Sequence, residues 1–350
     1  MIALEEKFLV NILYRPESEI LNGVDINNIN FEKLITLTSG HLMLPALFFN
    51  IQKKKAVYLF PEDFIDYIKG IYAINKARNE ILLDEAKELS ELLVEHNIKH
   101  IFLKGTALLL SNVFEDIGER MIGDIDFIIQ HKDEDKIKKV LEKNKYCSKI
   151  TGHIKNPKPV LIPKHLPRRV NKNKKIAIEP HLELLSPGWR VVFNSKRLSS
   201  AFKENIKAIK TPNQSFLFDH CIYAFQIPDK GFFIPYHGHR SIYDIYKLDC
   251  KKSLTINNIK KDIFKKHFFL TIEKFNIFDL QIPSSFWSLC HDKCLIVLIT
   301  LYSKLIFKNK FFVLILLPCN KSLRKRALNK IKYHYSNKTL LNYTYRWLIG

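Results

Sequence analysis

The sequence predicts an α+β fold, in which a small β-sheet is flanked by N-terminal and C-terminal helical regions. Residues 100–129 have the pattern of a strand, a turn, a helix and a second strand, and residues 176–184 restore a period of two. Apolar residues recur at helical spacing before residue 96 and after residue 213. The chain has 350 residues, 47% of them hydrophobic, so it can bury a sizeable core.

The first region, residues 1–75, is predicted to be helical. Residues 31–37 and 42–51 carry apolar side chains at helical spacing, and Thr38-Ser-Gly40 breaks the pattern between them. Pro61 marks the start of a long acidic helix that should reach residue 96 and lead into the first strand. The predicted buried stripe of this helix consists of Leu82, Leu83, Ala86, Leu89, Leu92 and Leu93.

A glycine follows the apolar run at residues 100–103. Gly105 ends that run, and Thr106 is placed to cap the helix that comes next. Such a turn leaves backbone N–H groups free beside the positive end of the helix dipole, so it can hold a phosphate. Gly105 and Thr106 are therefore candidate phosphate ligands.

Two aspartates lie in the period-two stretch after Gly123. Asp124 and Asp126 share one face of the predicted strand, while Ile125 and Phe127 share the other. Two carboxylates held close together repel each other unless a cation lies between them. The pattern indicates a divalent metal site, with magnesium as the expected ion and manganese as the alternative.

A third strand is predicted further along the chain. Residues 134–144 should form a helix that packs on the sheet, and the Pro- and Lys-rich stretch 151–175 a loop over the site. The alternation in residues 176–184 then places Glu179, His181 and Glu183 on one face. Pro180, in the middle of this stretch, indicates an edge strand.

The order of these motifs is similar to that of a known family. Lys104-Gly-Thr-Ala-Leu108 followed by Arg120-Met-Ile-Gly-Asp-Ile-Asp126 resembles the nucleotidyltransferases of the polymerase-beta-like superfamily, in particular the bacterial NTP_transf_5-like family of uncharacterised nucleotidyltransferases. Lys76-Ala-Arg-Asn79 and Glu179-Pro-His181 match the family pattern too, whereas Thr106 replaces the serine usual in the wider superfamily. The resemblance implies a mixed-sheet nucleotidyltransferase core at residues 76–200 and a basic helical region at 201–350.

The resemblance also implies roles for individual residues. Asp124, Asp126 and Glu179 would hold two metal ions, with Glu183 as the runner-up for the third carboxylate. Lys104 and Arg120 would join Gly105 and Thr106 as nucleotide ligands, although Lys104 could equally point away from Gly105 and serve the fold.

Three residues of the predicted C-terminal helices would lie near the nucleotide side of the cleft, namely His220, Arg240 and Asp244. A buried ion pair is the alternative for Arg240 and Asp244. His181 is expected to orient its neighbours rather than to act as a nucleophile, because no Ser or Cys is placed to partner it.

The net charge of +21 is concentrated in two segments. Residues 151–175 carry +8 and residues 291–350 carry +11, which leaves +2 for the rest. A localised basic surface favours a polyanionic partner such as a nucleotide, RNA or an anionic membrane face. The alternative is a general bias of the composition toward lysine.

The six cysteines are scattered without disulfide spacing, which favours a reducing cytoplasm. The N-terminus shows no signal-peptide pattern, so a cytoplasmic protein is expected. Cys290-His291-x-x-Cys294 lacks a second ligand pair, and zinc is not expected. Lys304, Lys308 and Lys310 interrupt the apolar segment 295–317, so we expect no transmembrane span.

The predicted function is transfer of an NMP from an NTP, such as ATP, to an unidentified acceptor: a small molecule, a tRNA end or a protein side chain. Two hypotheses compete with it. One is a catalytically silent protein that binds nucleotide or RNA, which the three intact carboxylates argue against. The other is a membrane-surface protein that uses residues 295–317.

Overall fold

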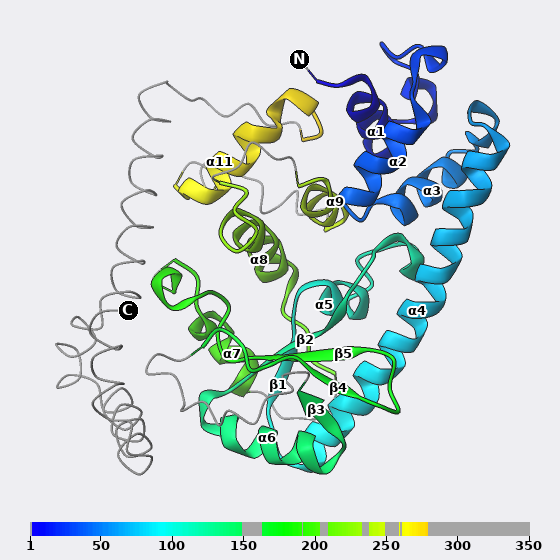
Figure 1. Ribbon diagram of the computed structural model, residues 1–350. Coiled ribbons are helices and arrows are strands. Elements are labelled where there is room, and N and C mark those ends of the chain that lie inside the picture. The colour runs from blue at the N-terminus through cyan, green and yellow to red at the C-terminus, as the bar shows by residue number, and fades with distance from the viewer. Residues whose placement is uncertain are drawn as a thin grey trace, which may run out of the picture.

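The computed structural model (Figure 1) describes residues 2–148, 163–190, 192–203, 209–232, 238–248, 259 and 261–278. Within these residues it has the α+β fold that the sequence predicts. Three expectations lie outside the described residues: the loop over the site at residues 151–162, the apolar segment 295–317, and the Cys290 to Cys294 group. Most of the expected basic C-terminal region lies outside them as well.

The N-terminal region is helical, as predicted. It consists of α1 (Leu4–Tyr14), α2 (Phe31–Gly40) and α3 (Leu44–Lys53), which Figure 1 shows together at the end of the molecule remote from the sheet. The helix start after Pro61 is confirmed. A break between the first two predicted helices exists, but it lies after Gly40, because Thr38-Ser-Gly40 still belongs to α2. The long helix α4 (Glu62–Glu95) has 34 residues, which corresponds to about 50 Å at the usual rise. It connects the helical end to the sheet and runs unbroken through residues 75 and 76, where we expected a domain boundary; that division stays a prediction.

The sheet is mixed, as expected. Its strands are β1 (His100–Phe102), β2 (Asp124–Ile129), β3 (Tyr146–Ser148), β4 (Arg169–Asn171) and β5 (Ala177–His181), in the order β1-β2-β5-β4-β3. The pair β2 and β5 is parallel, and the other neighbours are antiparallel. Helix α5 (Lys104–Leu110) connects β1 to β2, and α6 (Glu134–Lys143) follows β2. The predicted loop at 151–175 therefore contains a short strand, β4.

The sheet separates two apolar clusters, and β2 contributes to both. Ile125, Phe127 and Ile129 belong to the large cluster that extends to the N-terminal helices. Ile128, on the opposite face, packs in a smaller cluster with Ile101 of β1. Side chains alternate along a strand, so Ile128 shares its face with Asp124 and Asp126. The polar part of that face is thus confined to the beginning of β2.

The prediction that Pro180 marks an edge strand is wrong, because β5 lies in the middle of the sheet. The N–H of Leu166 donates to the carbonyl of Pro180 at 2.8 Å. The N–H and C=O of one strand residue point to the same side, so the missing N–H of Pro180 faces the segment around Leu166 and not β2. The proline therefore costs no hydrogen bond in the β2–β5 ladder.

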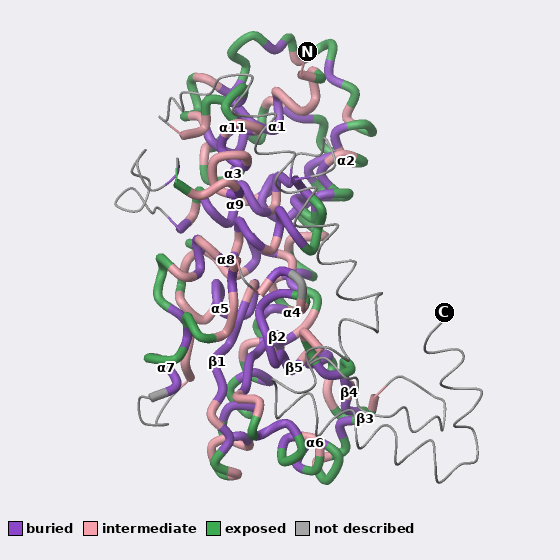
Figure 2. The backbone as a smooth tube through the Cα atoms, turned by 90° about the vertical axis from the view of Figure 1, so that its left-hand side faces the viewer, coloured by how far each residue is buried: buried purple, intermediate pink, exposed green. Residues whose placement is uncertain are grey.

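The C-terminal part of the described chain is helical. Its helices are α7 (Ser199–Lys203), α8 (Gln214–Gln226), α9 (His239–Lys247) and α11 (Ile263–Ile272), and α8 and α9 confirm the two predicted helices. Helices α8 and α9 lie between the sheet and the N-terminal helices, whereas α7 lies beside the sheet (Figure 1), and Figure 2 shows buried residues continuing through α8 and α9. No described helix alone is long and apolar enough to cross a membrane; α2 and α3 reach that length only as a pair bent by 118°.

Candidate active site

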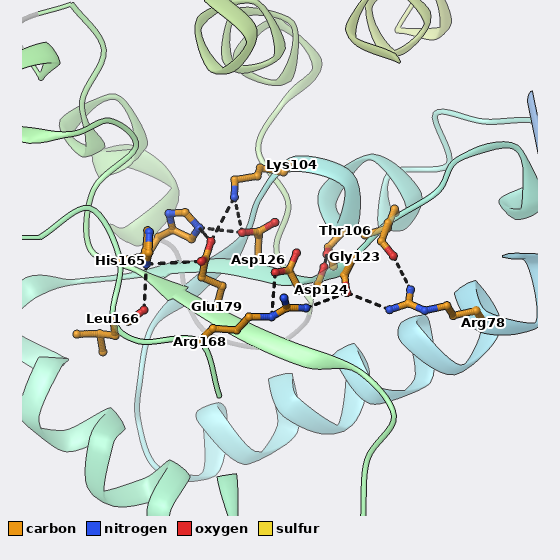
Figure 3. Close-up of polar contacts among 12 residues, drawn as sticks. Arg78, Lys104, Thr106, Gly123, Asp124, Asp126, His165, Leu166, Arg168 and Glu179 are labelled. Atoms are coloured by element: carbon orange, nitrogen blue, oxygen red, sulfur yellow. Dashed lines mark hydrogen bonds and ion pairs between the residues drawn. The ribbon is translucent and has the colours of Figure 1, made fainter. Parts of the chain in front are cut away.

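Three carboxylates lie together at the start of β2 and on β5 (Figure 3). Asp126 is the ladder partner of Glu179, and Asp124 precedes Asp126 on the same face of β2. Asp126 is 4% exposed, whereas the side chain of Glu179 is 17% exposed. The parallel pairing of two short strands is therefore what brings together acidic residues that are far apart in the sequence.

Basic side chains surround these carboxylates. The Nζ of Lys104 lies 2.6 Å from Oδ1 of Asp126 and 3.4 Å from Oε2 of Glu179. The Nε2 of His181 lies 2.8 Å from the same oxygen of Asp126 and 3.1 Å from the same oxygen of Glu179. Asp124 has a different partner, Arg168, at 3.4 Å. Each carboxylate thus has a basic neighbour, so side chains provide part of the charge compensation that we expected from metal ions.

The surroundings shift the pKa values of the two outer carboxylates in opposite directions. Burial raises the pKa of Glu179, but the hydrogen bond with His181 and the charge of Lys104 outweigh burial and hold the pKa well below its usual range. Burial and the charge of Asp126 raise the pKa of Asp124 above its ordinary value. Glu179 is therefore stabilised as an anion, while ionised Asp124 needs a further positive charge nearby.

Lys104 is held in its charged form. Burial alone would lower the pKa of its ammonium, but Asp126, Glu179 and Asp124 together raise the pKa above the ordinary value. The Nζ of Lys104 contacts two of the carboxylates, and its expected contact with a nucleotide stays a prediction.

The donor atoms fit a divalent cation. One oxygen of Asp126, one oxygen of Glu179 and a ring nitrogen of His181 all lie within 4.8 Å of one another. Carboxylate oxygens are the ligands of Mg²⁺, and imidazole nitrogen is accepted by transition metals. Asp124 is not part of this group of three, so the expected metal set of Asp124, Asp126 and Glu179 stays a prediction.

Glu183, the runner-up for the third carboxylate, makes other contacts. The chain leaves the sheet after His181, where the N–H groups of Leu182 and Glu183 both donate to the carbonyl of Lys164. The predicted alternation through residue 184 is therefore too long. One oxygen of Glu183 lies 2.9 Å from Nε2 of His131, and the other accepts the backbone N–H of Ser195 at 3.1 Å. These contacts tie two connecting segments together.

Gly105 lies inside α5 and not in a turn before it. The helix begins at Lys104 with Leu103 as its N-cap, so the prediction of Thr106 as the cap is wrong. A Cβ on Gly105 would lie 2.9 Å from Cγ1 of Ile122, so the glycine allows close packing on the segment that enters β2. Thr106 is fully buried, and its hydroxyl donates to the carbonyl of Asp124 at 3.2 Å. Both residues position β2, and their binding of phosphate stays a prediction.

A cavity of about 180 Å³ lies next to Lys104. Its polar lining comes from α5, the segment before β2, the segment before β4, α8 and α9, and includes Lys104, Arg120, Lys164, His220, Arg240 and Asp244. The structure therefore brings the three residues of the predicted C-terminal helices to one place. A second hollow of about 470 Å³, lined in part by His41 and Phe225, shares Arg240 with this cavity.

Arg120 forms a buried ion pair. Its Nε donates to Oδ1 of Asp244 at 2.6 Å, and a second guanidinium nitrogen donates to Oδ2 at 2.8 Å. Asp244 thus does form a buried ion pair, but with Arg120 and not with Arg240, which lies 3.8 Å from Asp229. The pair links the segment before β2 to α9. Phosphate binding by Arg120 stays a prediction.

A group of polar side chains on α4 holds the segment before β2, and its contacts were not predicted from the sequence. Asn79 donates to the carbonyls of Ile117 at 2.6 Å and Arg120 at 2.7 Å. Asn75 also donates to the Arg120 carbonyl, and Arg78 donates to that of Gly123 at 2.9 Å, as Figure 3 shows for Arg78. These bonds fix the segment that carries Asp124. The signal was present in Lys76-Ala-Arg-Asn79, but helical spacing does not reveal which carbonyls such side chains reach.

A family model described as "Uncharacterised nucleotidyltransferase" (NTP_transf_5) matches residues 27–248. The match extends from the segment before α2 to the end of α9 and includes all the carboxylates of the site. No curated protein and no solved structure matches the chain. The matched region covers more than half of the chain, with its fold and its carboxylates, and the chain therefore belongs to this family of uncharacterised nucleotidyltransferases.

Proposed function

We propose that the protein transfers a nucleoside monophosphate from an NTP to an acceptor, using magnesium ions held by Asp126, Glu179 and Asp124. The observation that carries this proposal is the pairing of Asp126 with Glu179 across the parallel ladder, beside a cavity lined by four Lys or Arg side chains and two aspartates. Membership of a nucleotidyltransferase family supports the same reaction class. An acidic cluster beside a basic cavity is suited to a polyphosphate and its counter-ions.

The reaction has a simple balance. An oxygen of the acceptor forms a bond to the α-phosphorus, the bond from that phosphorus to the pyrophosphate oxygen breaks, and the acceptor proton leaves to a base or to water. Bound magnesium would neutralise charge on the attacking and leaving oxygens. The low pKa of Glu179 suits a cation ligand better than a proton acceptor. His181 would keep Asp126 and Glu179 in place, because its Nε2 contacts both.

The two hollows offer a place for the NTP. The cavity beside the carboxylates carries Lys104, Lys164 and Arg240, which suits the triphosphate. The adjoining hollow of about 470 Å³ is lined in part by His41 and Phe225, and a volume of several hundred Å³ suits a base and ribose. The acceptor would then approach on the side of Asp124, where the side chain of Arg168 is 52% exposed.

The test uses purified protein, Mg²⁺ or Mn²⁺, whole-cell extract and each NTP labelled at the α-phosphate. We expect one fraction of the extract to become labelled, and the γ-labelled form of the same NTP to leave it unlabelled. Asp126→Asn and Glu179→Gln should abolish labelling, and Glu183→Gln should retain it. Label transfer that persists in both Asp126→Asn and Glu179→Gln would refute the assignment. Binding of an NTP without any transfer would favour the catalytically silent alternative.

A further inference from the structure

The ammonium of Lys104 occupies the position where a cation would be bound. It lies 2.6 Å from Asp126 and 3.4 Å from Glu179, on the same oxygen atoms that His181 contacts. A divalent ion bound by Asp126 and Glu179 would need those oxygens. The Lys104 ammonium and the metal ion cannot both bind these carboxylate oxygens, because two positive charges so close repel strongly in a partly buried site. Binding of the metal therefore requires Lys104 to leave.

Lys104 has a place to go. Its side chain is 31% exposed, and the residue lines the cavity together with Lys164 and Arg240. A lysine stem has four carbons and can turn its ammonium from the carboxylates into the cavity without moving the backbone. In the cavity, a polyphosphate would offer oxygens in exchange for those of Asp126 and Glu179.

Lys104 carries its side chain at a strained backbone position that points it at the carboxylates. Lys104 has φ of +51°, in the left-handed region that residues with a Cβ seldom adopt. Glycine or asparagine would fit this backbone with less strain. Figure 3 shows the side chain directed at Asp126 and Glu179 from the start of α5. Strain of this kind persists where the surroundings and the function require it.

We infer that Lys104 is an exchangeable counter-ion: it neutralises Asp126 and Glu179 in the metal-free site, is displaced by the divalent cation, and then binds the polyphosphate of the NTP. This inference rests on the proposed function, because it needs a metal and a polyphosphate at this site. Its consequence is positive coupling between the two. A metal ion that binds without NTP must displace an ammonium that finds no new partner. With NTP bound, the displaced ammonium contacts the polyphosphate, so the metal binds more tightly. By linkage, NTP must also bind more tightly when the metal is bound.

The first experiment measures the binding of Mn²⁺ alone, without nucleotide, by the electron paramagnetic resonance signal of the free ion. The variants are Lys104→Met and Lys104→Gly, and the controls are Lys164→Met and Asp126→Asn. Glycine suits the positive φ of this position, so Lys104→Gly protects against misfolding. Both Lys104 variants should bind Mn²⁺ about tenfold more tightly than the wild type, as expected for removal of one charge-assisted hydrogen bond that the metal must break. Lys164→Met should tighten Mn²⁺ binding less than either Lys104 variant, because Lys164 lines the same cavity and interacts with Asp126 and Glu179 through its charge but has no hydrogen bond to them, among the described contacts, that the metal must break. Asp126→Asn should lose the binding.

The second experiment measures the binding of an NTP analogue with a non-cleavable α–β bridge in the presence of saturating Mn²⁺. Lys104→Met should weaken this binding about tenfold, in the opposite direction to its effect on Mn²⁺ alone. If Lys104→Met binds Mn²⁺ no more tightly than the wild type while Asp126→Asn loses it, the inference is overturned and the proposed metal site stands. If neither the wild type nor Lys104→Met binds Mn²⁺, or if Asp126→Asn binds it unchanged, the proposed metal site fails as well.

Discussion

The two glutamates near the end of β5 provide a sharp test of the site, because one neutral substitution should have opposite consequences at the two positions. Glu179→Gln removes a charge beside Asp126, Lys104 and His181. Glu183→Gln removes a charge beside His131 and the backbone of Ser195. We expect the first change to abolish nucleotide transfer with the fold retained, and the second to weaken the fold with transfer retained.

The magnitudes follow from the contacts. Residues that only orient a metal ligand typically contribute about 10- to 100-fold to activity, so loss of the ligand Glu179 should cost at least about 100-fold in rate. Glu183 is 8% exposed and accepts two hydrogen bonds. A glutamine keeps one acceptor oxygen and turns an NH₂ group toward one of the two partners. The loss of one charge-assisted hydrogen bond should cost about 1.5–3 kcal/mol in the free energy of unfolding.

The assay is pyrophosphate release with the acceptor present, together with urea denaturation of each purified variant. Glu179→Asp is the matched control, since it keeps the charge but shortens the side chain, and it should lie between the wild type and Glu179→Gln in rate. An inactive Glu183→Gln combined with an active Glu179→Gln would show that the parallel register of β2 and β5 is wrong by two residues. Full activity of both variants would refute the assignment of either glutamate to the metal site.

Three further predictions concern stability, each measured by urea denaturation. Gly105→Ala should cost about 1–3 kcal/mol because its Cβ meets Ile122, and the double variant with Ile122→Ala should lose less than the sum of the two single changes. Arg120→Met should cost about 3–5 kcal/mol because it leaves the Asp244 charge buried without Arg120, and adding Asp244→Leu should restore most of that loss. In the presence of chelator, the stability of the wild type should fall from about pH 5 downward, because the folded chain holds the pKa of Glu179 well below 4.5 and the unfolded chain takes up the proton first. Glu179→Gln should lack this part of the loss of stability in acid. An equal loss of stability in the wild type and in Glu179→Gln would contradict the prediction.

Much of the fold could be predicted because its signals are local. The helix start after Pro61 and the strand around Asp124 and Asp126 depend only on neighbouring residues, and the structure confirms them. Where β5 ends could not be predicted in the same way. The apolar and polar pattern continues to Leu184, but the bonds of Leu182 and Glu183 to the carbonyl of Lys164 take the chain out of the sheet.

The partners of the charged residues were harder to predict, because each pair joins distant parts of the chain. The sequence did not reveal that Lys104 contacts Asp126 or that Arg120 contacts Asp244. Periodicity assigns a side chain to a face of an element but does not say which element lies opposite. For Thr106 the signal was misleading, since a hydroxyl residue after a glycine suggested a helix cap, while the fold uses it to bond the carbonyl of Asp124.

The geometry of the carboxylates depends on helices outside the sheet. The Nδ2 of Asn50 on α3 donates to the hydroxyl of Tyr243 on α9, at 2.9 Å, and that hydroxyl donates to Glu119 at 2.6 Å. Asn79 on α4 and Asp244 on α9 bind the same segment at Arg120. The segment before Asp124 is thus fixed from three helices, so small shifts of their packing would move Asp124 relative to Glu179. This accounts in physical terms for a family match that includes α2, α3 and α4 as well as the sheet, because the helical layer holds the strands at the spacing that the proposed reaction needs.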